Sequence, residues 1–168
     1  MKIKISNLAD SDYDFEFEDD VQKLELDDIY KGKFHTKVNL RKFQDQIILK
    51  SKTDINAHLI CDRCAAEFDN VLSSEYKMVY LLRNEEIENE YSDVTYISPD
   101  SDFINIRNDV RDFAILAVPM KKLCKENCKG LCQQCGKNLN EGDCSCQKNV
   151  VDSRWQPLME LKNKLKTN

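Results

Sequence analysis

Hydrophobic and polar residues alternate along most of the first hundred positions of the chain. This two-residue period is typical of a β-strand that buries one face. It runs through Phe34, Thr36, Val38 and Leu40, continues at 47–49 and 55–61, and returns in an aromatic-rich stretch at 72–82. The pattern predicts long antiparallel strands joined as a meander.

Shorter or less regular segments flank this meander. Residues 2–8 and 94–97 are each expected to form a short strand. Residues 9–28 hold ten carboxylates and one lysine, which suits either a loop or a charged sheet edge. Residues 84–102 carry seven acidic side chains and no basic one. They are interpreted as a solvated insertion, with an acidic surface for a basic partner as the alternative.

Helical spacing appears only towards the C-terminus. Ile106, Val110, Phe113, Ala114 and Ala117 mark one helix near 106–118, which Pro119 ends. A last helix is expected from 152 or 153, with Leu158, Leu161 and Leu165 on one face and Trp155 as its anchor in the core. The predicted fold class is α+β: an antiparallel β-rich body with one or two helices, then a Cys-rich zinc-binding segment and a terminal helix.

Charge divides the 168 residues into two parts. Residues 1–120 carry 15 Lys and Arg against 25 Asp and Glu, whereas residues 121–168 carry 10 against 5. We therefore expect an acidic body (1–120) and a basic, cysteine-rich tail (121–168), packed together as one domain. The N-terminus lacks a signal-peptide core and no apolar stretch approaches a membrane span, so the expected location is the cytoplasm, without a membrane partner.

The eight cysteines form four pairs with chelating spacing. A Cys-x-x-Cys turn directs two thiolates at one ion, and a glycine after the second cysteine allows the positive φ that such a knuckle needs. Eight thiolates suit two zinc ions with four each, and the candidate ligands are Cys61, Cys64, Cys124, Cys128, Cys132, Cys135, Cys144 and Cys146.

Loop length favours one grouping of these pairs. Cys132 and Cys135 lie close in sequence to Cys144 and Cys146, so they would share one ion, leaving the other four for the second. The alternative pairs the two Cys-x-x-Cys knuckles, as in a zinc ribbon. A disulfide framework is disfavoured without a secretory signal. Iron–sulfur ligation is the serious rival, because four thiolates suit clusters as well.

Lysines surround the cysteines of the tail. They are ordinary solvated side chains individually, but together they are the best nucleic-acid contacts of the chain. The candidates are Lys121, Lys122, Lys125, Lys129, Lys137 and Lys148. Sites with four thiolates leave no open position for water, and the chain has neither a phosphate-binding loop nor a nucleophile elbow. An enzyme is therefore not expected, and no small-molecule substrate is evident.

Several segments carry a more specific signal: Leu59-Ile60-Cys61-Asp62-Arg63-Cys64, Ile104-Asn105-Ile106, Pro119, the run from Leu123 to Asn140, Cys144-x-Cys146 and Asp152-Ser153-Arg154-Trp155. Together they resemble the YceD family of large ribosomal RNA subunit accumulation proteins. The family commonly has proline where Ser153 stands. The resemblance extends from about Val38 onward, and the Cys-Lys-Gly-Leu-Cys run is its most specific part.

This resemblance implies a bacterial or plastid role in the accumulation or processing of large-subunit (23S) ribosomal RNA and in ribosome assembly. The expected partners are that RNA, a ribosomal protein, or both. The alternative is an adaptor that binds a ribosomal protein through its acidic body without touching RNA. An RNA-processing enzyme is a third and more distant hypothesis.

Overall fold

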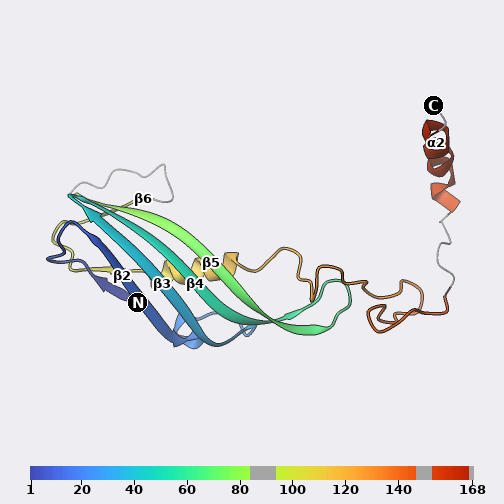
Figure 1. Ribbon diagram of the computed structural model, residues 1–168, viewed down its shortest axis with the longest axis horizontal. Coiled ribbons are helices and arrows are strands. Elements are labelled where there is room, and N and C mark those ends of the chain that lie inside the picture. The colour runs from blue at the N-terminus through green and yellow to red at the C-terminus, as the bar shows by residue number, and fades with distance from the viewer. Residues whose placement is uncertain (84–93, 147–152, 167–168) are drawn as a thin grey trace.

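The computed structural model describes residues 1–83, 94–146 and 153–166 (Figure 1). The strands are β1 (Lys2–Lys4), β2 (Asp12–Asp20), β3 (Tyr30–Phe43), β4 (Gln46–Ile60), β5 (Glu67–Leu82), β6 (Val94–Ile97) and β7 (Phe103–Asn105). The helices are η1 (Val21–Leu24), α1 (Arg107–Leu116), η2 (Ser153–Trp155) and α2 (Gln156–Lys166). This combination confirms the predicted α+β class.

Five strands form one long, twisted sheet in the order β2-β3-β4-β5-β6. The β2 to β5 neighbours are antiparallel, as the meander predicts, and only β5 and β6 run parallel. Phe34 lies opposite Ile55, which lies opposite Leu72, so the apolar residues share one face. The strand predicted at 2–8 covers only β1, which pairs with β7 in a separate small sheet.

Helix α1 covers the apolar face of the sheet. Ile106, Val110 and Ala114 have no exposed surface, and the ring of Phe113 stacks on that of Tyr76 with 4.5 Å between centroids. The hydroxyl of Tyr30 donates to the carbonyl of Ala114 at 2.9 Å. The helix ends before Pro119, as expected, because a residue that precedes proline disfavours helical geometry.

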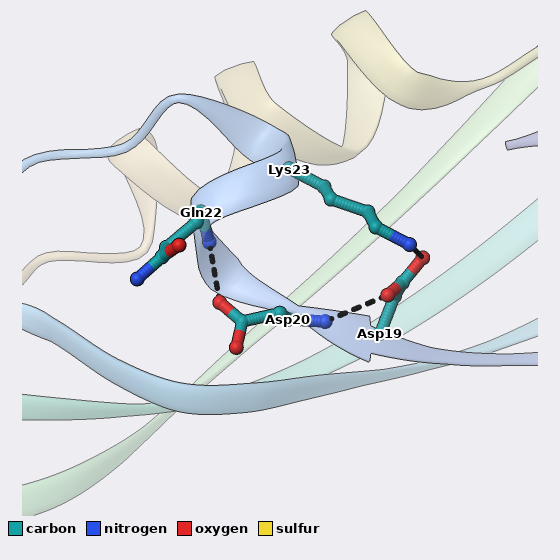
Figure 2. Close-up of polar contacts among 4 residues, drawn as sticks. All are labelled: Asp19, Asp20, Gln22 and Lys23. Atoms are coloured by element: carbon teal, nitrogen blue, oxygen red, sulfur yellow. Dashed lines mark hydrogen bonds and ion pairs between the residues drawn. The ribbon is translucent and has the colours of Figure 1, made fainter.

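The short helix η1 packs beside α1 on the same face (Figure 2). Asp20 caps it by accepting a hydrogen bond from the backbone N–H of Gln22 at 2.9 Å. Lys23 reaches back to Asp19 at 2.7 Å, and Asp19 also accepts from the N–H of Asp20. These contacts turn the chain at the end of β2 and direct Val21 and Leu24 into the core.

The acidic segment 9–28 contains the edge strand β2, so the charged-edge interpretation holds. Four of its carboxylates meet basic or amide side chains of β3. Asp12 binds Arg41 at 2.6 Å, and Glu18 binds Lys33 at 2.7 Å. The hydrogen bond from Arg41 lowers the pKa of Asp12, and that from Lys33 lowers the pKa of Glu18. Part of the negative charge of this segment is therefore compensated within the sheet.

The C-terminal part departs from one expectation. Trp155 is 57% exposed and Leu158 is equally exposed, so neither is anchored in the core. The side chain of Leu165 lies outside the described residues. The Cys-rich segment extends beyond the end of the sheet that carries the β4–β5 hairpin loop (Figure 1). Among the described residues, no helix has the length and apolar character needed to cross a membrane.

Candidate metal centres

The eight cysteines gather into two groups of four. The proximal site contains Cys61, Cys64, Cys124 and Cys128, and the distal site contains Cys132, Cys135, Cys144 and Cys146. Within each group all Sγ atoms lie within 4.8 Å of one another. This arrangement is the one that loop length favours, and it differs from the ribbon-like pairing.

The separations between sulfurs suit four ligands around a single ion. Cys61 and Cys128 have their Sγ atoms 3.8 Å apart, and Cys64 and Cys124 have theirs 3.7 Å apart. A regular tetrahedron with zinc–sulfur bonds of about 2.3 Å has edges of about 3.8 Å. A disulfide, by contrast, requires about 2.05 Å, and all eight cysteines are free.

Both sites contain the same backbone knuckle. In the proximal site the carbonyl of Cys61 accepts from the N–H of Ala65, and its own N–H donates to Ala66, both at 2.9 Å. In the distal site the carbonyl of Cys132 accepts from Gly136, and its N–H donates to Lys137, again at 2.9 Å. The residue after the second cysteine has a positive φ in both, 55° for Ala65 and 73° for Gly136.

The hairpin between β4 and β5 supplies the first half of the proximal site. Cys61 follows the last residue of β4, and Cys64 lies three residues before β5 begins. The register of the sheet therefore fixes where these two thiols stand. Both are buried, together with Cys128, against Ala66 and Phe68.

The hairpin loop also binds the tail through the two residues inside its Cys-x-x-Cys turn. Asp62 accepts from the N–H of Lys122 at 2.6 Å, and Arg63 donates to the carbonyl of Cys128 at 2.9 Å. The carbonyl of Arg63 accepts from Leu131 at 3.1 Å. The sequence analysis assigned no role to Asp62 or Arg63. Their position between two candidate ligands could have indicated that they contact the rest of the site.

Neighbouring groups lower the pKa of some of these thiols and raise the pKa of others. The backbone N–H of Cys124 is the main cause that lowers the pKa of Cys61 to about 6, and the N–H of Cys135 does the same for Cys132. Burial and the adjacent thiols raise the pKa of Cys124 to about 12. Hydrogen bonding with Cys135 contributes most to raising the pKa of Cys146 to about 12. A cation among the sulfurs would favour full ionisation of either group.

Asn140 connects the two sites, a role that the sequence analysis did not assign to it. It lies in the loop between Cys135 and Cys144 of the distal site, yet its amide donates to Sγ of Cys128 in the proximal site at 3.3 Å. Its side-chain oxygen accepts from the N–H of Lys129 at 2.9 Å. The amide helps to lower the pKa of Cys128 against the opposing effect of burial.

The candidate lysines of the tail have different surroundings. Lys121, Lys125 and Lys129 are exposed, and Lys122 is half-buried. Lys137 donates to the carbonyl of Asp143 at 2.9 Å, so it braces the distal loop as well as offering charge. Lys148 lies outside the described residues.

Replacing Asn140 by alanine is expected to weaken metal binding at the proximal site by about tenfold, because partners of the ligands typically contribute 10- to 100-fold. Asn127→Ala is the matched control, since Asn127 is an exposed residue between two proximal ligands. Equilibrium competition with a chromophoric chelator measures both affinities. Equal affinities for the two variants would show that the Asn140–Cys128 bond does not support the site.

Comparison with known proteins agrees with the resemblance. The family model described as large ribosomal RNA subunit accumulation protein YceD matches residues 49–162. An Arabidopsis thaliana protein named large ribosomal RNA subunit accumulation protein YCED homolog 1, chloroplastic, is 30% identical over 45% of this chain and 24% of its own length. The Zea mays protein of the same name is 42% identical over 26% of this chain and 15% of its own length.

The aligned segments thus span about a quarter or less of these curated relatives. No solved structure matches the chain. The matched range 49–162 extends from the start of β4 through both cysteine sites into α2, and it covers more than half of the chain. The chain belongs to the family of the large ribosomal RNA subunit accumulation protein YceD.

Proposed function

We propose that this chain acts as a non-enzymatic factor in the accumulation or processing of large-subunit (23S) ribosomal RNA and in ribosome assembly. The observation that carries the proposal is the family match over residues 49–162. The names of the Arabidopsis and maize relatives refer to the same RNA. We infer that the acidic body (1–120) and the tail (121–168) work as one unit, joined at the proximal site.

The metal that we propose for both sites is zinc, bound by the four thiolates of each site. An iron–sulfur cluster distributes its cysteine ligands over two or more irons, so their sulfurs lie farther apart than sulfurs around one ion. The close gathering of all four Sγ atoms within 4.8 Å supports a single ion. A closed four-thiolate site stabilises a fold and leaves no position for a reacting water.

Contacts within the sheet favour RNA over the adaptor hypothesis. An adaptor would need free carboxylates in the acidic body to attract a basic ribosomal protein. Four carboxylates of β2 are engaged by β3; among them, Glu16 lies 3.6 Å from Lys37, and Asp14 accepts from Asn39 at 2.8 Å. Engaged carboxylates attract a basic partner less strongly, which weakens the adaptor hypothesis.

Depleting the protein in the organism that encodes it is expected to lower mature large subunits and 23S ribosomal RNA, while small subunits continue to accumulate. Sucrose gradients and RNA blots for both ribosomal RNAs measure this ratio. A plasmid copy of the wild-type chain serves as the control and should restore it. Unchanged profiles, or a defect confined to the small subunit, would contradict the proposed function.

A further inference from the structure

The face of the large sheet opposite α1 carries a hollow of about 740 Å³. One row of aligned residues crosses the four strands β2 to β5 at this point. The side chains of Val38, Ser51 and Tyr76 in that row are buried on the other face, so the backbone of the row forms the floor of the hollow. Exposed side chains of the two adjacent rows form its walls. Four lysines of β3, β4 and β5 are among them: Lys37, Lys50, Lys52 and Lys77.

The strand register places these lysines in like-charged pairs. Lys37 lies directly opposite Lys52, and Lys50 lies directly opposite Lys77. Residues in such positions have Cβ atoms about 4.5–5.5 Å apart, and like charges there destabilise the sheet. Two repulsive pairs around one hollow are a local conflict of the kind that is often found at functional sites.

Only one of these pairs is compensated by neighbouring carboxylates. Lys37 has Glu16 at 3.6 Å, and Lys52 has Glu75 at 2.8 Å. Neither Lys50 nor Lys77 forms an ion pair with any carboxylate of the residues that the structure describes. Among the residues that the structure describes, Lys50 and Lys77 thus form a like-charged pair in the hollow without a carboxylate partner.

We propose that this hollow binds the phosphate backbone of an RNA strand, with Lys50 and Lys77 as its principal contacts. A phosphate between the two ammonium groups replaces their repulsion by two charge-assisted hydrogen bonds. The open sheet face lets a chain of phosphates enter and leave, and Lys52 is positioned about 7 Å from Lys50 along the same strand. The inference rests on the proposed function, because it takes ribosomal RNA as the partner.

Binding of a short fluorescein-labelled oligouridylate to the full-length, zinc-loaded chain tests this surface. The variant is Lys50→Gln with Lys77→Gln. Its matched control is Lys2→Gln with Lys4→Gln, which makes the same change of charge at two exposed lysines of β1 in the separate small sheet. Fluorescence anisotropy at a series of salt concentrations gives the affinity and its salt dependence.

We expect the Lys50/Lys77 variant to bind several-fold more weakly at low salt. The slope of log affinity against log salt should become shallower by about 0.7, since the two lysines share one phosphate and each phosphate contact to a single strand contributes about 0.7. The Lys2/Lys4 variant should bind like wild type. The melting temperature of the Lys50/Lys77 variant should not fall, because the substitution removes a repulsion.

Three results would overturn the inference. They are an unchanged slope in the Lys50/Lys77 variant, an equal loss in both variants, and equally tight, lysine-dependent binding of polyglutamate, which would indicate an acidic protein as the partner. Ribosomal RNA levels in depleted cells that carry wild type or either variant distinguish failure of this inference from failure of the proposed function. If the wild-type chain restores 23S RNA but the Lys50/Lys77 substitutions leave RNA binding unchanged, only the RNA-binding surface is wrong.

Discussion

Serine at both Cys61 and Cys64 is expected to reduce the zinc content of the purified protein from two ions per chain to one. The two remaining proximal thiolates hold zinc poorly, because a structural site needs all four ligands. The same change should release the tail from the hairpin, since Cys124 and Cys128 then have no partners there. Elemental analysis of protein purified without added metal measures the content.

Loss of this site should also weaken the sheet itself. The ion would cross-link Cys64 and Cys124, which lie 60 residues apart, and so close a loop that contains β5, β6, β7 and α1. A cross-link over such a loop stabilises a fold by about 4 kcal/mol in the chain-entropy treatment used for disulfides. Denaturant unfolding followed by circular dichroism should show a loss of this order.

Serine at both Cys132 and Cys135 is the control for the previous variant. It should likewise leave one zinc per chain, but the stability of the sheet should change little, because the distal site closes only a short loop within the tail. Iron in place of zinc with a visible charge-transfer band, or an equal loss of sheet stability in both variants, would contradict this assignment.

Alanine at Gly130 is expected to damage the proximal site far more than alanine at Gly136. Both glycines have a positive φ, 77° and 73°, so the backbone strain of the substitution is similar. A Cβ at Gly130 would lie 3.0 Å from the carbonyl oxygen of Arg63, whereas a Cβ at Gly136 meets nothing within 4 Å. The backbone of the hairpin loop cannot move aside without breaking the Arg63–Leu131 hydrogen bond.

Strain alone costs of order 1 kcal/mol at either position. The displaced loop should about double this cost for Gly130→Ala, through the loss of one hydrogen bond of about 1 kcal/mol. Competition for zinc with a chelator, together with thermal unfolding, measures the difference. If the two variants behave alike, close packing between Gly130 and Arg63 does not hold the tail against the hairpin.

Much of the fold could be predicted because one face of the sheet is buried. The alternation of Phe34, Val38 and Leu40 with polar residues follows directly from a sheet covered on one side only. The outcome for 9–28 could not be predicted from the same rule. Its carboxylates are satisfied by Arg41 and Lys33 of the next strand, and local sequence does not reveal which strand will be the neighbour.

The candidate sites likewise contain some features that the sequence predicts and others that it does not. Ligand spacing and short loops predict both four-cysteine groups, since these depend on local chain geometry. The contact of Asn140 with Cys128 depends on how one folded loop lies against another. The Lys50–Lys77 pair depends on strand register, which relates residues 27 positions apart. Trp155 was expected in the core because a lone tryptophan is more often a core residue than a ligand platform, but that tendency does not supply an apolar surface to cover it.

The hairpin origin of the proximal site has a consequence for the order of events during translation. Cys61 and Cys64 emerge together and can be presented as soon as β4 and β5 pair. Cys124 follows Cys64 by 60 residues, so at a synthesis rate of about 5–20 residues per second it is added about 3–12 s after Cys64. During that interval the nascent chain exposes two of the four proximal thiols, and with the zinc that we propose the supply of metal at the ribosome would decide how soon the tail docks.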